Sequence, residues 1–275
     1  MEIKYICPFW GQDKTTASTF IENALSAGFD GVEVNVPDDN AFEDDLLKTI
    51  NETGCVLIAQ QWLPPKDESV AEYMIRFRER MERLITFNPV FINSHTGKDF
   101  FSFSDNCKII KQANRISKIS GVKIVHETHR GRFNFSTFAT QVYLDKFPNM
   151  QINADISHWC NVSESFLEDQ QETLELAFKH SYYIHARVGH TQSAQVNDPF
   201  APEWKETLDI FVGWWKRILI NANARGDKEF YICPEFGPYP YMPYFTNPFE
   251  PMQDQWDLNV KMMNYLKKEL IEFDK

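Results

Sequence analysis

Three carboxylates and one histidine of this chain each stand at the end of a short apolar segment. They are Glu127, Asp155, His185 and Glu235. A carboxylate buried on its own is costly to ionise, whereas a divalent cation shared by all four side chains would remove that penalty. Three carboxylates and one imidazole suit Mn²⁺, Mg²⁺, Co²⁺ or Zn²⁺ and do not select among them. The pattern therefore predicts that these four residues bind one divalent metal ion.

Each of the four residues also has an ordinary structural explanation when it is taken alone. Glu127 could form capping or loop hydrogen bonds, and Asp155 could begin a turn. His185 could be a hydrogen-bonded core histidine, and Glu235 could form a salt bridge. Their occurrence at the ends of four consecutive apolar segments favours a shared metal site over four separate roles.

The apolar segments that carry these residues belong to a series that is rich in Val, Ile, Phe and Tyr. We predict eight strands, at Ile3–Cys7, Gly31–Val36, Val56–Gln61, Val90–Ser94, Val122–Glu127, Gln151–Ile156, Tyr182–Val188 and Phe230–Glu235. Several of them are apolar at consecutive positions, which is typical of parallel strands that are buried on both faces.

Amphipathic segments between these strands predict helices. Apolar residues recur at helical spacing in several of the connections, for example at Val70, Tyr73, Met74, Phe77, Met81, Leu84 and Ile85. Glycines are expected to end three of the helices, at Gly28, Gly54 and Gly121. Ser104 and Ser136 are expected to cap the first turns of two others.

Eight strand–helix units in succession predict a (β/α)8 TIM barrel. An open, doubly wound sheet is the alternative, but it favours a Gly-rich first turn, and the turn here is Pro8-Phe9-Trp10-Gly11 with no GxGxxG motif. No linker or low-complexity tract interrupts the series, so we expect one barrel domain over residues 1–275. In such a barrel the functional residues lie at the carboxyl ends of the strands, where six of the seven histidines fall.

The strand-end residues resemble the metal-binding pattern of the xylose isomerase-like TIM-barrel superfamily. The resemblance is carried by an ordered set, Glu127, Asp155-x-x-His158, His185 and Glu235. The segment Gly31-Val32-Glu33-Val34 is also similar to the second strand of that superfamily. The superfamily includes sugar and sugar-phosphate isomerases and epimerases, inosose dehydratases and endonuclease-IV-like nucleases that act at abasic sites. The resemblance covers essentially the whole chain.

The resemblance implies a role for each matching residue. Glu127 and Glu235 would be metal ligands, together with Asp155 and His185, and would also form an acid/base pair on opposite faces of a bound ketose. His158 would contact a substrate oxygen. Arg187, two residues beyond His185, would contact a hydroxyl, carboxylate or phosphate group. The implied function is a metal-dependent isomerase or epimerase that acts on a small ketose or related carbohydrate through an enediolate.

Aromatic residues are expected to line the sugar-binding pocket. Trp10 follows the first predicted strand, Trp62 follows the third and His95 follows the fourth, so all three are candidates for substrate contact. The segment 238–245 is dense in proline and aromatic residues. Because proline reduces the entropy cost of ordering a loop, this segment predicts a semi-rigid lid or wall. The alternative is that it packs on the barrel rim or at a subunit interface.

A second polar cluster follows Glu127 and consists of His129, Arg130 and Arg132. These side chains would either bind an acidic group of the substrate or lie solvated at the rim. His126 precedes Glu127, so the alternation of side chains along a strand is expected to point it away from the ligand, in a structural role.

Three other functions use the same residues. A dehydratase or lyase would act on a keto sugar or an inosose-like substrate and would expel a hydroxyl group instead of returning a proton to carbon. An abasic-site nuclease would need further ligands for its three-metal cluster, but Gln60-Gln61-Trp62 and Asn197-Asp198-Pro199 stand where those ligands are expected. A barrel that binds sugar without turnover is the remaining alternative, and would be favoured if one glutamate could not reach the substrate.

Composition and charge limit the partners and the location of the chain. The 28 Lys and Arg residues and 39 Asp and Glu residues give a net charge of −11, so we expect no nucleic-acid partner. The five cysteines are odd in number and widely spaced, which predicts free thiols in a reducing, cytoplasmic compartment. Neither a signal peptide nor an apolar run long enough to cross a membrane is evident. The aromatic content is compatible with a homo-oligomer.

Overall fold

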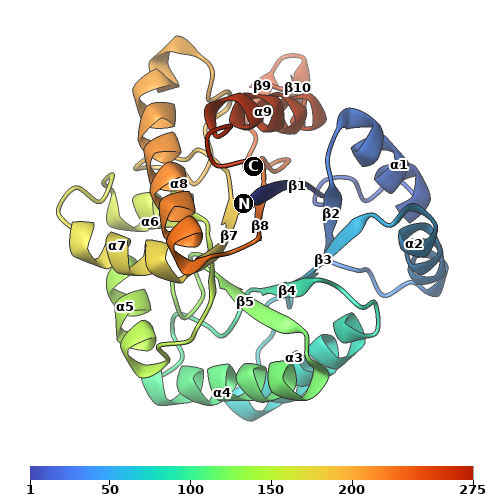
Figure 1. The fold of residues 1–275 in the computed structure, drawn as a ribbon, viewed down its shortest axis with the longest axis vertical. Coiled ribbons are helices and arrows are strands. Elements are labelled where there is room, and N and C mark those ends of the chain that lie inside the picture. The colour runs from blue at the N-terminus through green and yellow to red at the C-terminus, as the bar shows by residue number, and fades with distance from the viewer. Residues whose placement is uncertain (275) are drawn as a thin grey trace.

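The computed structural model describes residues 1–274, in which eight parallel strands form one closed barrel in the order of the sequence (Figure 1). The strands are β1 (Glu2–Pro8), β2 (Gly31–Val34), β3 (Val56–Gln61), β4 (Phe91–Ser94), β5 (Lys123–Glu127), β6 (Ile152–Ala154), β7 (Ser181–His185) and β8 (Glu229–Cys233). β8 pairs with β1 and closes the barrel. The predicted (β/α)8 barrel is confirmed, and an open sheet is excluded.

Helices follow the strands and cover the outside of the barrel (Figure 1). They are α1 (Ala17–Ala27), α2 (Asn40–Thr53), α3 (Val70–Ile85), α4 (Phe103–Ser120), α5 (Thr137–Lys146), α6 (Ile156–Ser163), α7 (Gln171–His180), the 3-10 helix η1 (Pro202–Trp204), α8 (Lys205–Arg225) and α9 (Gln255–Glu269). None of the helices in the described part of the chain combines the length and the apolar character needed to cross a membrane.

Local sequence explains where several helices begin and end. The three predicted glycine ends are confirmed, because Gly28, Gly54 and Gly121 each adopt the left-handed conformation directly after a helix. Ser136 caps α5 as predicted. The prediction for Ser104 was wrong. Helix α4 is capped by Ser102, whose hydroxyl accepts a hydrogen bond from the Asp105 N–H at 3.1 Å, and Ser104 lies inside the first turn.

Four strands end earlier than the sequence predicts. β6 ends at Ala154 because the Asp155 carboxylate accepts a hydrogen bond from the Ser157 N–H at 3.2 Å and caps helix α6. β2, β7 and β8 also stop short of their predicted ends. As a result Asp155, Arg187 and Glu235 lie just beyond the strands, at the carboxyl end of the barrel.

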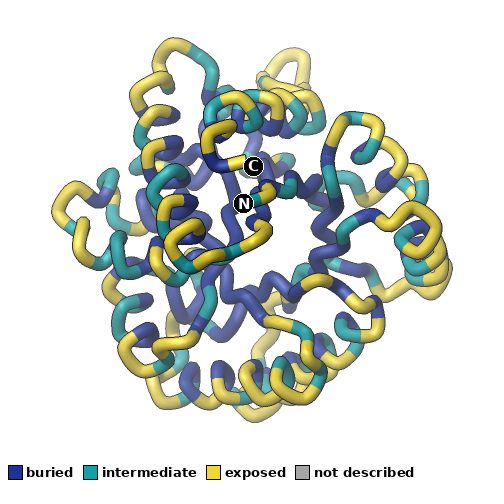
Figure 2. The backbone as a smooth tube through the Cα atoms, in the orientation of Figure 1, coloured by how far each residue is buried: buried dark blue, intermediate teal, exposed yellow. Residues whose placement is uncertain are grey.

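The interior of the barrel changes from apolar to polar along its strands. Toward the amino end, buried apolar side chains form a cluster of Ile6, Ile58, Phe91, Val125, Tyr183 and Tyr231, which Cys233 joins from the end of β8. Because alternate residues of a strand point to the same face, the side chain two positions later also points into the barrel. That position is occupied by Asn93 on β4, Glu127 on β5 and His185 on β7. Figure 2 shows that the strands are buried along nearly their whole length.

Two long loops lie at the carboxyl end of the barrel, after β7 and β8. The second contains a small antiparallel hairpin, β9 (Tyr244–Thr246) and β10 (Phe249–Pro251). Gln195 of the first loop joins them, because its side chain accepts a hydrogen bond from the Gly237 N–H at 2.7 Å and donates one to the Gly237 carbonyl at 3.1 Å. Gly237 has no room for a side chain, since a Cβ there would come within 2.1 Å of the Trp10 ring.

Candidate functional site

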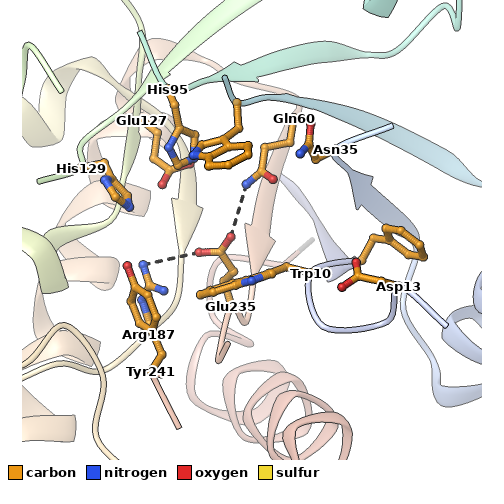
Figure 3. A pocket seen from close by; sticks show the side chains of 12 residues that line it. Trp10, Asp13, Asn35, Gln60, His95, Glu127, His129, Arg187, Glu235 and Tyr241 are labelled. Carbon is orange, nitrogen blue, oxygen red and sulfur yellow. Dashed lines mark hydrogen bonds and ion pairs between the residues drawn. The ribbon is translucent and has the colours of Figure 1, made fainter. Parts of the chain in front are cut away.

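A cavity of about 340 Å³ opens at the carboxyl end of the barrel (Figure 3). Four residues predicted to contact substrate line it, namely Trp10, Trp62, His95 and Arg187. Glu127 and Glu235 line it as well. Apolar rings combined with a few convergent polar groups are typical of a site for a small molecule.

The four predicted metal ligands come together beneath this cavity. Glu127, Asp155, His185 and Glu235 each offer one ligand atom, and these atoms all lie within 4.8 Å of one another. All four side chains are buried. His185 Nδ1 lies 2.9 Å from a Glu235 oxygen and 3.7 Å from a Glu127 oxygen. The barrel therefore gathers three carboxylates and an imidazole that could hold a metal ion.

A fifth ionisable group, Glu33 on β2, contacts the same histidine from the other side. A carboxylate oxygen of Glu33 lies 3.2 Å from His185 Nε2, and Asn93 donates a hydrogen bond to Glu33 at 3.3 Å. A carboxylate at one ring nitrogen fixes the orientation of a metal-binding histidine and leaves the other nitrogen for the metal. Nδ1 of His185 makes no hydrogen bond of normal geometry, although Glu235 is close. These donors fit a divalent cation.

The role of Glu33 was missed at the level of sequence. The segment Gly31–Val34 served only to identify the second strand. One signal was available, because Glu33 is a charged residue within an otherwise apolar strand, and such a residue is rarely buried without a partner. It is 3% exposed here.

The two glutamates that line the cavity have opposite acidities. Burial raises the pKa of Glu127 to about 7, and the nearby Glu235 carboxylate adds to that rise. Burial would also raise the pKa of Glu235, but His185 and Arg187 outweigh it and lower that pKa to about 2. Two carboxyl groups whose pKa values are driven apart are suited to act as an acid and a base.

The charges of Asp155 and His185 depend on these neighbours. Burial raises the pKa of Asp155 to about 6, against the effect of Arg187, whose guanidinium forms an ion pair with it. Burial lowers the pKa of His185, but the carboxylates of Glu235, Glu33 and Glu127 raise it well above the usual value. The proton on Nδ1 is the one that a bound cation would displace.

Arg187 lies between two aromatic rings of the cavity wall. Its guanidinium carbon is 4.8 Å from the centre of the Tyr241 ring and 5.8 Å from that of Trp10. His158 does not line the cavity. It is fully buried, and its Nε2 lies 2.9 Å from a nitrogen of Arg187, which donates to it. Tyr241 belongs to the proline-rich segment that the sequence predicts to be a lid or wall, and it forms part of the cavity wall.

The polar residues after Glu127 divide between the cavity and the protein interior. His129 lines the cavity, and its ring centre is 4.8 Å from that of His95. Arg132 is buried, which excludes the solvated-rim alternative for this residue. Arg130 lies over the Tyr241 ring at 5.1 Å. His126 points away from the cavity, as predicted, and its Nδ1 is 2.7 Å from the Thr96 hydroxyl.

Comparison with known proteins identifies the fold. No protein-family model and no curated protein sequence matches the chain. Solved structures match along nearly its whole length. A xylose isomerase-like TIM-barrel protein from Mycobacterium smegmatis, in complex with magnesium, gives a TM-score of 0.64 at 9% identity, and the alignment covers 99% of this chain and 98% of that one.

Two structures with stated activities match to a similar extent. The 3-keto-D-glucoside 4-epimerase from E. coli gives a TM-score of 0.63 at 12% identity, covering 97% of this chain and 100% of that one. A probable 3-DHS dehydratase from Bacillus anthracis gives 0.62 at 15% identity, covering 96% and 98%. An endonuclease IV is among the other matches. The predicted xylose isomerase-like fold is confirmed, and because these proteins catalyse different reactions, the fold alone leaves the reaction open.

Proposed function

We propose that this protein is a divalent-metal-dependent isomerase or epimerase of a small ketose or related carbohydrate. The observation that carries the proposal concerns the four clustered metal-ligand candidates. Of these, Glu127 and Glu235 alone are among the residues that line the cavity, and their pKa values are driven in opposite directions. The two carboxylates therefore have access to a bound substrate and suit opposite steps of a proton transfer.

The metal would be held by Glu127, Asp155, His185 and Glu235. When bound, it would supply Lewis acidity that stabilises negative charge on substrate oxygens. The buried positions of all four side chains support this assignment, because a cation would compensate the cost of burying their charges. Glu33 would hold the His185 ring in place through Nε2.

The proton transfer would use the two glutamates in turn. One glutamate would take the proton from the carbon next to the substrate carbonyl, and the other would return a proton to carbon. Each group would then be ready for the reverse reaction after exchange with solvent. Opposite placement of two such groups across a ketose would allow inversion at one carbon.

Arg187 would neutralise charge that develops on a substrate oxygen during this transfer. His158 accepts a hydrogen bond from it at 2.9 Å, so we assign His158 to the positioning of Arg187 rather than to direct contact with the substrate. Trp10, Trp62 and Tyr241 would cover the apolar face of the sugar and exclude water. His95 would contact a further oxygen of the substrate.

The proposal is tested by metal analysis followed by a screen of ketoses in deuterated water. We expect bound divalent metal in the purified protein. We also expect an isomer of the substrate that carries deuterium from the solvent and has lost no water. Glu127→Gln and Glu235→Gln should each lower the rate by about 10²–10⁴-fold, the contribution of a positioned acid or base. Glu203→Gln, at an exposed glutamate, is the matched control.

Other outcomes would select the alternatives. A product that lacks one water would identify a dehydratase, which employs the same residues to expel a hydroxyl group. A barrel that only binds sugar would show no turnover in the original protein. Both glutamine variants would then bind the sugar as tightly as the original protein does. Cleavage of DNA at abasic sites would identify a nuclease. Each of these results contradicts the proposed reaction.

A further inference from the structure

We propose that His95, Glu127 and His129 form a second divalent-cation site beside the first. One ligand atom from each residue lies within 4.8 Å of the other two. All three side chains line the cavity, and Figure 3 shows them together on one side of it, away from Asp13. The site shares Glu127 with the proposed first site and in this respect rests on the proposed function. His95 and His129 belong to neither the first ligand set nor the acid/base pair.

His95 provides the first independent observation for this site. The side chain is only 7% exposed, yet neither of its ring nitrogens has a hydrogen-bond partner. Its Nε2 lies 3.0 Å from a Glu127 oxygen, without hydrogen-bond geometry. Leaving a buried polar group without a hydrogen-bond partner opposes folding. A cation held between the imidazole and the carboxylate would satisfy both groups.

His129 provides the second observation. Its Nδ1 faces the backbone carbonyl oxygen of Arg130 and donates a hydrogen bond to it. This bond assigns the proton to Nδ1 and leaves the lone pair on Nε2. Metal-binding histidines are held in this way by a carbonyl or carboxylate at the other ring nitrogen. The His129 ring is therefore already fixed, and the lone pair of its Nε2 is left for a metal ion.

The chemistry of this donor set differs from that of the first site. The first site offers three carboxylates and one imidazole, whereas the second offers two imidazoles and one carboxylate. Nitrogen ligands favour Zn²⁺, Co²⁺ or Ni²⁺ over Mg²⁺. Three protein ligands at the edge of a cavity leave a coordination position for a water or a substrate oxygen, as in catalytic rather than structural zinc sites. A second cation here would bind a further oxygen of a polyhydroxy substrate.

The test is the stoichiometry of Zn²⁺ and Co²⁺ binding to the metal-depleted full-length protein, read by elemental analysis and by Co²⁺ visible absorption. We expect two equivalents of Zn²⁺ in the original protein and one in His129→Asn and in His95→Gln. The Asp155→Asn variant should also bind one equivalent of Zn²⁺. That equivalent should be the one whose binding depends on His129. His190→Gln, outside both ligand sets, is the control and should retain two.

The outcomes separate this proposal from the proposed function. If His129→Asn binds as much Zn²⁺ as the original protein, the second site does not exist, whatever the result for Asp155→Asn. If Asp155→Asn alone leaves the stoichiometry unchanged, the first site is wrong and the second stands. His129 is only partly buried, so its substitution should fold normally, which the thermal unfolding curve of the variant checks.

Discussion

The two ends of the barrel interior are built from the same strands but perform opposite tasks. Toward the amino end, Phe91 packs edge-on against Tyr183 and Tyr231, with ring centres 5.2 and 5.3 Å apart. Toward the carboxyl end, Glu33, Asn93 and several other polar side chains fill the corresponding space. Phe91 and Asn93 are only two positions apart on β4. Stability and chemistry are therefore divided between adjacent layers of side chains.

The energetic consequences of the two layers differ in sign. Burying a large apolar side chain contributes about 1.5–3 kcal/mol to stability. Burying an ionised carboxylate without a compensating charge opposes folding. The polar layer holds Glu33, Glu127 and Glu235, and the structure compensates them through His185, Arg187 and hydrogen bonds. The apolar layer must therefore offset the cost of burying these charges.

The largest expected effect comes from the apolar layer. Phe91→Ala should lower the free energy of unfolding by about 3–5 kcal/mol, because it removes a buried ring and leaves a cavity. Urea unfolding measures the change. Phe138→Ala, at a phenylalanine that is 73% exposed, should alter stability by less than about 0.5 kcal/mol. An equal effect of the two substitutions would contradict the division of the barrel into layers.

The energetic cost of burying carboxylates in the polar layer should make the stability of the protein depend on pH. In the metal-free protein the pKa of Glu127 is raised from 4.5 to about 7. Between these values the folded state holds a proton that the unfolded chain has released, so the contribution of Glu127 to stability falls as pH rises. Glu127→Gln removes this contribution. Its stability relative to the original protein should therefore increase from pH 4.5 to pH 7, by up to about 3 kcal/mol.

Urea unfolding at a series of pH values measures this difference. Glu203→Gln should give a difference that does not vary with pH, since Glu203 is exposed. Added divalent metal should raise the stability of the original protein at pH 7 more than that of Glu127→Gln. A pH-independent difference for Glu127→Gln would mean that the polar layer carries no penalty at this residue.

The smallest expected effect is at the rim of the polar layer. Gly237→Ala places a methyl group where the Trp10 ring lies and should displace that ring from the cavity wall. We expect KM for the carbohydrate substrate to rise about tenfold, a change of about 1.4 kcal/mol. Gly213→Ala, in helix α8 with no atom near the new methyl group, should leave KM unchanged. An unchanged KM for Gly237→Ala would exclude Trp10 as a substrate contact.

The amino-acid sequence by itself determined the barrel and the position of its functional end. Apolar strands alternate with amphipathic helices, and this pattern depends on neighbouring residues alone. The period of two along each strand then places Glu127 and His185 inside the barrel, two positions beyond Val125 and Tyr183. The four metal-ligand candidates could be chosen from sequence because each lies at or just beyond the end of a strand, and the carboxyl ends of parallel strands meet at one end of a barrel.

Only the tertiary structure decided which side chains meet one another. Glu33 and His185 are 152 residues apart and touch because the closed barrel brings β2 and β7 to its centre. The exclusion of His158 from the cavity and the meeting of His95 with His129 depend on loop conformations and side-chain rotamers. Those are fixed by packing among distant segments. No local pattern of residues specifies them, and for that reason they were not predicted.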